Sequence, residues 1–247
     1  MSSQPYVFKN IVNSFRYLYN DADLLLQLAT KAEGFDKTQL SRTALLLFVL
    51  SLEGLINRVM DHFLPPRVHD FIVEREENLS FEDKWLLVPL MVSQIADCQF
   101  DTSSYPWSHF AELVRLRNDY VHPKHDRPAY YRALSPHTWE PLDWKRIPVN
   151  SGITEKELIY RQTQIPKDPY AVLPEHVVKA KQIVDDMVTK LDAFLGGRLN
   201  ADKWRHSDSM KLVYPEGAKL TDIPNSDNTR GTTTTNANNA SKNQGVA

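Results

Sequence analysis

The chain has 247 residues, with 29 Lys and Arg against 31 Asp and Glu, a formal net charge of −2, and only 8 glycines. The near-neutral charge excludes a protein whose whole surface is basic enough to bind nucleic acid in general, and also an acidic, solvating chain. Neither of the common glycine-rich phosphate loops is present. The single cysteine, Cys98, excludes an intramolecular disulfide and a thiolate zinc cluster, and fits a reducing cytoplasm.

The first third of the chain is typical of long helices, because apolar residues recur with a period near 3.6. A first helix is predicted from about Phe8 to Glu33, with Gly34 as its stop, and a second, largely apolar one from about Thr38 to Phe63. Pro65-Pro66 ends the second helix, and residues 68–78 form a connector.

Two more helices precede a change in composition. Ser80 and Asp83 have the spacing of a capping box, which predicts a helix from 81 to about 96 that Pro89 kinks or divides. Ser104-Tyr105-Pro106 is a cap-and-proline start for a helix through Val121. From 123 to 174 lie 8 of the 15 prolines, which predicts an irregular insertion with a short hairpin.

The periodicity returns for a closing helix from about Glu175 to Leu195, which Gly196-Gly197 ends. We therefore predict an all-α, up-and-down helical bundle over residues 1–200, a C-terminal extension over 201–221 and a disordered, low-complexity tail over 222–247. The N-terminus does not resemble a secretory signal, and the longest apolar run, Ala44–Leu50, is too short for a membrane helix. We expect a cytoplasmic protein with no membrane partner.

The most informative segment is RLRNDYVHPKHDR, residues 115–127. Helical spacing places Arg117 on an apolar stripe, and a buried guanidinium must be paired or face a wet cleft. The stripe consists of Phe110, Leu113, Val114 and Val121. His122 precedes a proline, so the helix is expected to end at Val121. A histidine beside a fixed cation suits phosphodiester cleavage, because one group moves protons while the other holds phosphate charge.

The charge near this segment is locally basic. Residues 115–132 carry five Lys and Arg against two Asp, a local charge of +3 in a chain of net charge −2. Such a patch is the electrostatic pattern expected for a phosphate-bearing partner. Lys124 and Arg127 are the candidate phosphate-binding residues within it.

Arg117-Asn118-x-x-x-His122 resembles the Arg-x(4–6)-His motif of HEPN domains, in its Arg-Asn form. The helix order is similar too, with SLEGLINRV (residues 51–59) resembling the family's buried second helix with its glutamate, Glu53. The resemblance implies a metal-independent ribonuclease that acts as a homodimer, in a defence or toxin role with a protein antitoxin or regulator. It implies that Arg117 binds the scissile phosphate, that His122 is acid or base, and that Asn118 orients the substrate or the histidine.

Two points leave the assignment open. Arg115 also satisfies the looser spacing to His122, so it is a supporting candidate beside Glu53. In members regulated by nucleotidyl transfer a tyrosine lies two residues after the histidine, where this chain has Lys124, so that regulation is not supported. Other members of the family are not nucleases but bind nucleotides or partner proteins.

The alternative to a catalytic site is structural. Arg117 would pair with Glu53 or with Asp119, and the chain would be a non-catalytic helical module that binds a nucleotide, RNA or a protein. No metal or other cofactor is expected, because Pro123 breaks the spacing of the His122–His125 pair and no thiolate is near. Aromatic residues in the insertion are expected to pack it onto the bundle rather than to stack on bases; they include Trp139 and Trp144.

Overall fold

A computed structural model describes residues 7–74, 79–93, 95–122, 128–199 and 209–213, and it divides into two units. One unit comprises Ile11–Ser209. The other combines Met1–Asn10 with Met210–Ala247, and its described part is a strand pair. In that pair β1 (Val7–Ile11) is hydrogen-bonded to β4 (Ser209–Val213). The prediction of a helix from Phe8 is therefore wrong at its start, and the tail predicted over 222–247 lies outside the described residues.

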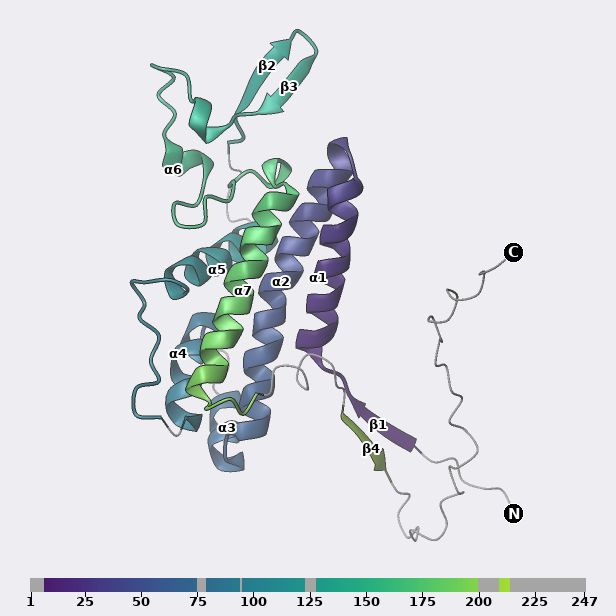
Figure 1. The fold of residues 1–247 in the computed structure, drawn as a ribbon, viewed down its shortest axis with the longest axis vertical. Helices are drawn as coiled ribbons and strands as arrows, with labels where there is room; N and C mark the ends of the chain where they lie inside the picture. The colour runs from purple at the N-terminus through teal and green to yellow at the C-terminus, as the bar shows by residue number, and fades with distance from the viewer. Residues whose placement is uncertain (1–6, 75–78, 94, 123–127, 200–208, 214–247) are drawn as a thin grey trace, which may run out of the picture. The chain divides into compact units, whose positions relative to one another are not determined.

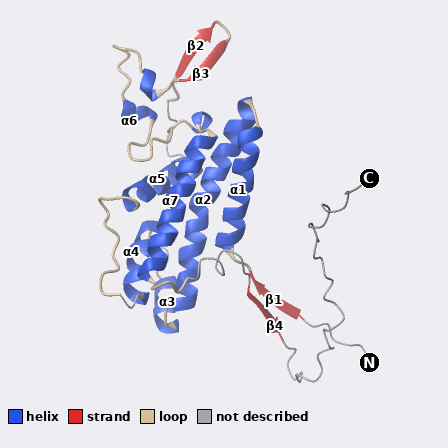
Figure 2. Cartoon of the chain, viewed as in Figure 1, coloured by secondary structure: helices blue, strands red, loops and turns tan. Residues whose placement is uncertain are grey.

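The larger unit is mostly helical, as the periodicity predicted (Figures 1 and 2). Its long helices are α1 (Ser14–Lys31), α2 (Gly34–Phe63), α3 (Pro66–Val73), α4 (Phe81–Val92), α5 (Trp107–Val121) and α7 (Pro174–Phe194). Residues 68–73 of the segment predicted to be a connector belong to the helix α3, which has Pro66 at its first position, where no backbone N–H is needed, and residues 75–78 lie outside the described residues. The helices α1, α2 and α7 run side by side (Figure 1).

Local sequence signals explain most of the helix boundaries. The Asn13 side chain accepts a hydrogen bond from the Arg16 N–H at 3.1 Å and caps α1, while Ser80 and Asp83 form the predicted capping box of α4. Gly34 does not stop α1, which ends at Lys31, but opens α2 with a φ of +55°, a conformation that suits glycine. The helix α4 continues through Pro89 undivided and ends at Val92, before the expected residue 96.

The start of α7 is capped by a histidine. The Nδ1 atom of His176 accepts a hydrogen bond from the backbone N–H of Leu173 at 3.0 Å. Burial lowers the pKa of His176 below its ordinary value, because the charged imidazole loses hydration there. The cap is therefore formed by the neutral side chain.

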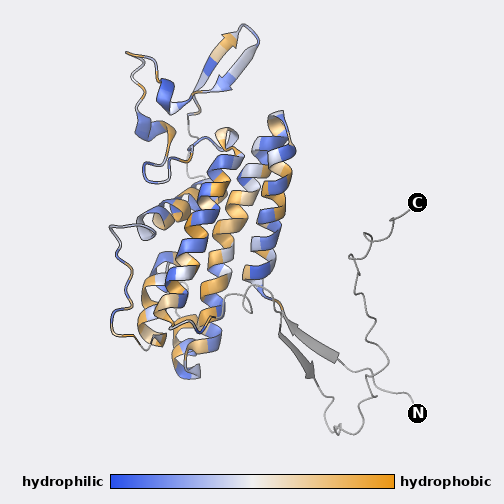
Figure 3. Cartoon of the chain, viewed as in Figure 1, coloured by the Kyte–Doolittle hydropathy of each residue, from blue (hydrophilic) through white to orange (hydrophobic). Residues whose placement is uncertain are grey.

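The core is organised around α2, which packs against α1, α4, α5 and α7 and is hydrophobic over much of its length (Figure 3). Leu45, Phe48, Leu52 and Ile56 have essentially no exposed surface. Gly54 allows the start of α1 to approach closely, since a Cβ added there would lie 2.9 Å from the Cβ of Ser14. Burial of this apolar surface is the main stabilising contribution to the bundle.

The helix α2 also has the length and apolar character that a membrane span requires, which the short run of residues 44–50 did not indicate. Of the 18-residue window with that character, 56% is buried inside the protein. The core helix of a helical bundle meets the same criterion, so the property is weak evidence for a membrane.

The insertion contains the predicted hairpin and is attached to α5. Strands β2 (Tyr131–Ser135) and β3 (Thr138–Pro141) pair antiparallel, and one-turn helices follow: η2 (Trp144–Arg146), α6 (Glu155–Leu158) and η3 (Pro169–Ala171). Trp139 is 64% exposed, so the prediction that it packs onto the bundle is wrong. Trp144 is half-buried, and the Lys145 ammonium lies 5.5 Å from the centroid of its ring.

Candidate functional site

The predicted motif lies at the C-terminal end of α5. The helix ends at Val121, and the backbone N–H of His122 donates to the carbonyl of Asn118 at 2.9 Å, which closes the last turn. This is the boundary that the His-Pro sequence predicted. Phe110, Leu113 and Val114 are buried on the core side of α5, as the periodicity indicated, whereas Val121 is 45% exposed.

Arg117 is held by two side chains. Its Nη2 donates to Oε2 of Glu53 on α2 at 2.9 Å, and its Nη1 donates to Oδ1 of Asn118 at 2.9 Å. The side chain of Arg117 is 20% exposed and that of Glu53 is 34% exposed, so the ion pair is partly shielded from water. The Nε atom of Arg117 is buried and has no hydrogen-bond partner among the described residues. Of the two partners the sequence left open, Glu53 and Asp119, the structure selects Glu53.

A second polar contact lies one turn further along α2. The Nζ atom of Lys84 on α4 donates to Oδ1 of Asn57 at 3.1 Å, although Lys84 is only 5% exposed. Glu53 and Asn57 thus present two polar side chains along one face of α2, one toward α5 and one toward α4. The i, i+4 spacing of Glu53 and Asn57 indicates a shared helix face, but nothing in the sequence indicates that the buried Lys84 contacts Asn57.

The other predicted residues do not converge on Arg117. His122 is exposed at the helix end, and no side-chain hydrogen bond involving it is found among the described residues. Arg115 is exposed and lines a pocket of about 1070 Å³ together with Glu112 and Asp119. Neither Arg117 nor His122 lines that pocket or the two smaller ones, of about 540 and 530 Å³. Lys124 and Arg127 lie outside the described residues.

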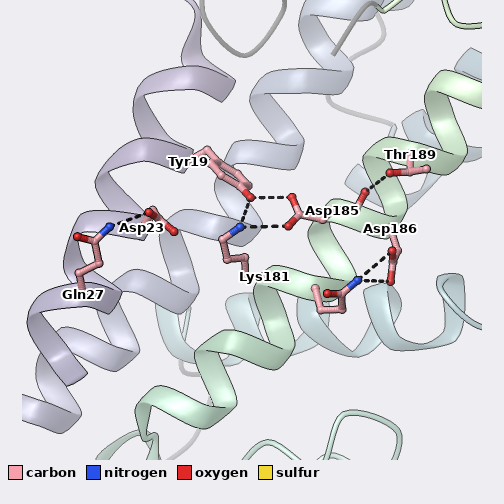
Figure 4. Close-up of polar contacts among 8 residues, drawn as sticks. Tyr19, Asp23, Gln27, Lys181, Asp185, Asp186 and Thr189 are labelled. Carbon is pink, nitrogen blue, oxygen red and sulfur yellow. Dashed lines mark hydrogen bonds and ion pairs between the residues drawn. The ribbon is translucent and has the colours of Figure 1, made fainter. Parts of the chain in front are cut away.

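One polar cluster was missed by the sequence reasoning. Tyr19 on α1 donates through its hydroxyl to Oδ1 of Asp185 on α7 at 2.6 Å (Figure 4). Lys181 donates to the Tyr19 hydroxyl at 2.5 Å and to Oδ2 of Asp185 at 3.1 Å, and its ammonium lies 4.9 Å from the centroid of the Tyr19 ring. Only the i, i+4 spacing of Lys181 and Asp185 could have indicated the cluster.

Burial and the neighbouring carboxylate shift the ionisation of this cluster. Burial, together with the hydrogen bond to Asp185, raises the pKa of Tyr19 above its ordinary value. Burial acts to lower the pKa of Lys181, but its hydrogen bonds to Tyr19 and Asp185 outweigh burial and raise that pKa. The cluster therefore keeps a neutral tyrosine between a charged lysine and a carboxylate, and it ties α1 to α7.

Comparisons with known protein families, curated proteins and solved structures found no match for the chain. The resemblance to HEPN domains therefore rests on the motif and the order of the helices. Within the described ranges, no group of three or more His, Cys, Asp and Glu side chains is arranged to hold a metal ion.

Proposed function

We propose that the chain is a HEPN-type protein that acts on RNA as a metal-independent endoribonuclease. The observation that carries the proposal is the fixed position of Arg117, at the same end of α5 as the exposed His122. A guanidinium has five N–H donors, and Glu53 and Asn118 occupy one each. The remaining Nη donors can bind the non-bridging oxygens of a phosphodiester, while Glu53 limits the rotation of the side chain.

The reaction uses groups of the RNA itself. The 2′-hydroxyl oxygen of the ribose attacks the adjacent phosphorus, the bond from phosphorus to the 5′-oxygen breaks, and a 2′,3′-cyclic phosphate forms. His122 takes the proton of the 2′-hydroxyl or supplies one to the leaving 5′-oxygen, and Arg117 stabilises the charge that develops on the phosphate. Asn118, which already contacts Arg117, orients the guanidinium or the substrate.

The proposal includes a homodimer in the cytoplasm, a role in defence or as a toxin, and a protein antitoxin or regulator. The apolar stripe of α5 is buried in the bundle, so it does not supply a free surface for a second copy. Exposed apolar side chains occur instead on one face of α4, where Leu87, Leu90 and Met91 are 41–45% exposed. A monomer in sedimentation at tens of micromolar would contradict the homodimer.

A second function is favoured by a different observation. Arg117 and Glu53 neutralise one another, and within the part of the chain that the structure describes, neither Arg117 nor His122 lines the pockets of about 540, 530 and 1070 Å³. That arrangement suits a non-catalytic helical module that binds a nucleotide, RNA or a protein, with Arg117 in a structural role.

The experiment that separates the two incubates the purified full-length chain with mixed RNA in EDTA. The wild type should cut the RNA and leave cyclic phosphate ends, whereas Arg117→Ala and His122→Ala should lose the activity. Arg67→Ala, at an exposed arginine on α3, is the matched control and should cut normally. The ribonuclease proposal fails if the wild type leaves RNA intact at high enzyme concentration, or if the two site variants cut as well as the control.

A further inference from the structure

A pocket of about 540 Å³ lies between the β2–β3 hairpin and the start of α7. Its lining comes mainly from β3, η2, α6 and η3 and from the first residues of α7, so the insertion and the helix that follows it form most of its walls. The volume lies within the roughly 300–1,000 Å³ that small-molecule sites occupy. The pocket includes neither Arg117 nor His122, so the function proposed for those residues assigns it no ligand.

Side chains of α5 hold the insertion in place on the bundle. Oε2 of Glu112 accepts from two backbone N–H groups of the insertion, at 2.9 and 2.8 Å. Further along α5, Oδ2 of Asp119 accepts from the Tyr160 hydroxyl at 2.5 Å, and the Tyr120 hydroxyl donates to the carbonyl of Pro166 at 2.9 Å. The walls that the insertion contributes to the pocket are therefore fixed by hydrogen bonds to the bundle.

The lining of this pocket is acidic. Among the described residues, five carboxylates line it against one basic side chain, Lys145. His176 also lines it, but burial keeps the pKa of His176 below its ordinary value, so that side chain adds no charge at pH 7. The neighbouring pocket of about 1070 Å³ has five basic side chains and four carboxylates over the same described ranges. The formal charge of −4 is thus specific to the smaller pocket, and its carboxylates are Glu140, Asp143, Glu157, Asp168 and Glu175.

Two of these carboxylates already pair with arginines. Glu140 lies 3.1 Å from Arg132, and Asp143 lies 3.8 Å from Arg146, and neither arginine lines the pocket. All four side chains are at least 43% exposed, so water screens both pairs. The two carboxylates therefore keep the capacity to accept hydrogen bonds from a ligand.

Two others are held by local hydrogen bonds. Glu157 accepts from the hydroxyl and the N–H of Thr154, at 2.6 and 2.7 Å, and these bonds lower the pKa of Glu157. Oδ1 of Asp168 accepts from the Tyr170 N–H at 2.9 Å, whereas its Oδ2 is buried and has no hydrogen-bond partner among the described residues. Burial and the nearby charge of Asp168 raise the pKa of Tyr131, yet the Tyr131 hydroxyl makes no hydrogen bond of normal geometry to that oxygen. An unpaired buried acceptor is unfavourable, and an N–H group of a ligand can supply the missing bond.

The walls between the carboxylates are largely apolar. Leu158 and Ile159 are buried there, and Leu142 is half-buried. The ammonium of Lys145 lies 5.5 Å from the centroid of the Trp144 ring, so the protein's own cation already occupies one face of that ring. A ligand ammonium is therefore expected to bind the carboxylates, while an aliphatic part of the ligand lies against the leucine and isoleucine side chains.

We infer that this pocket binds a linear aliphatic polyamine. Such a molecule carries several ammonium groups joined by methylene chains, so its charges suit carboxylates that come from separate segments, and its chains suit the apolar walls between them. One ammonium donates to Oδ2 of Asp168, and the others donate to Glu157 and Glu140. The acidic lining repels the phosphates of a nucleotide or RNA, so the inference is separate from the proposed functions.

The test is calorimetric titration of the full-length chain with spermidine at about 0.15 M salt. Spermidine should bind with a dissociation constant below about 1 mM, and at least about tenfold more tightly than n-butylamine, which has a four-carbon chain but a single ammonium. Absence of spermidine binding at about 1 mM overturns the inference, and so does equal affinity for the two amines.

Matched variants assign the binding to this pocket. Glu157→Gln/Asp168→Asn should weaken spermidine at least about tenfold, whereas Asp21→Asn/Glu74→Gln, which removes two exposed carboxylates elsewhere, should not. Lys145→Gln removes the basic side chain that competes with the ligand, so it should tighten spermidine at least about threefold, with Lys31→Gln on α1 as its control. The gain expected for Lys145→Gln does not depend on the stability of the double variant. Equal changes in a variant and its control overturn the inference.

A competition arm separates a polyamine from other cations. Spermidine should remain bound in the presence of an equal concentration of MgCl2 or of a tetralysine peptide. Displacement by Mg²⁺ would overturn the inference, because charge alone would then be recognised. Displacement by the peptide would also overturn it, because lysine side chains of a partner protein would then fit the pocket as well as a free polyamine does.

Discussion

Replacement of Glu53 by alanine tests the ion pair on which the candidate site depends. The substitution removes the acceptor 2.9 Å from Nη2 of Arg117 and leaves the guanidinium only 20% exposed. Since Nε of Arg117 already lacks a partner among the described residues, a second donor of the same group would then lose its acceptor. Glu53→Ala is expected to destabilise the bundle.

The magnitude follows from the exposure of the pair. A hydrogen bond to a charged group contributes about 1.5–3 kcal/mol when well shielded. The side chains here are 20% and 34% exposed, so water screens part of that interaction and we expect a loss of about 1–2 kcal/mol. For a chain of this size, such a loss lowers Tm by about 2–8 °C.

The assay is urea unfolding of Glu53→Ala, Arg117→Ala and the double variant, combined as a double-mutant cycle. The coupling between the two positions should be about 1 kcal/mol. A parallel cycle of Glu53→Ala with Arg115→Ala, on another face of α5, should give no coupling. If the coupling between 53 and 117 is below about 0.3 kcal/mol, the ion pair contributes nothing and the reasoning is refuted.

Three further predictions use features of the bundle. Gly54→Ala should lower the free energy of unfolding by about 1–3 kcal/mol in urea, because the new Cβ meets Ser14 at 2.9 Å; a gain in stability, as helix propensity alone predicts, would contradict this. His176 has a lowered pKa in the folded protein, so its contribution to stability is fully present above its ordinary pKa of 6.5 and is lost as the pH falls below 6.5 and through the lowered pKa. His176→Gln should therefore make the decrease in Tm between about pH 7.5 and 5.5 less steep. A decrease as steep as in the wild type would refute the role of neutral His176 as the cap that accepts from the Leu173 N–H. Tyr19 has a raised pKa, so stability is lost as the pH rises above 10.0, its ordinary value. Tyr19→Phe should lower the free energy of unfolding by about 1 kcal/mol at pH 8. It should also make the loss of stability at alkaline pH less steep, and a loss as steep as that of the wild type would contradict the prediction.

The helices of the bundle could be predicted because the residues that start and end each helix lie close to it in the sequence. The capping box of Ser80 and Asp83 and the His-Pro sequence each act within one turn, so they placed the start of α4 and the end of α5 closely. Strand β1 could not be predicted, because its partner β4 lies about two hundred residues later and no local pattern specifies that pairing.

The candidate site was predictable only in part. The stripe on α5 indicated that Arg117 needed a partner, and helical spacing on α2 offered Glu53, but only the packing of the two helices distinguished Glu53 from Asp119. The pocket beside Arg115 was not predictable, because its far wall comes from a proline-rich segment without periodicity. The exposure of Trp139 was missed since composition alone does not show which side of a hairpin faces solvent.

The way in which Glu112 holds the insertion affects which substitutions the protein can tolerate. Its carboxylate accepts main-chain N–H groups, which every residue except proline supplies at positions 162 and 163. The exposed side chain of Gln162 is therefore free to change without loosening the attachment, whereas a change at Glu112 removes both hydrogen bonds at once. A surface of the insertion can thus diversify in sequence while Glu112, with Asp119 and Tyr120 on the same helix, preserves its position.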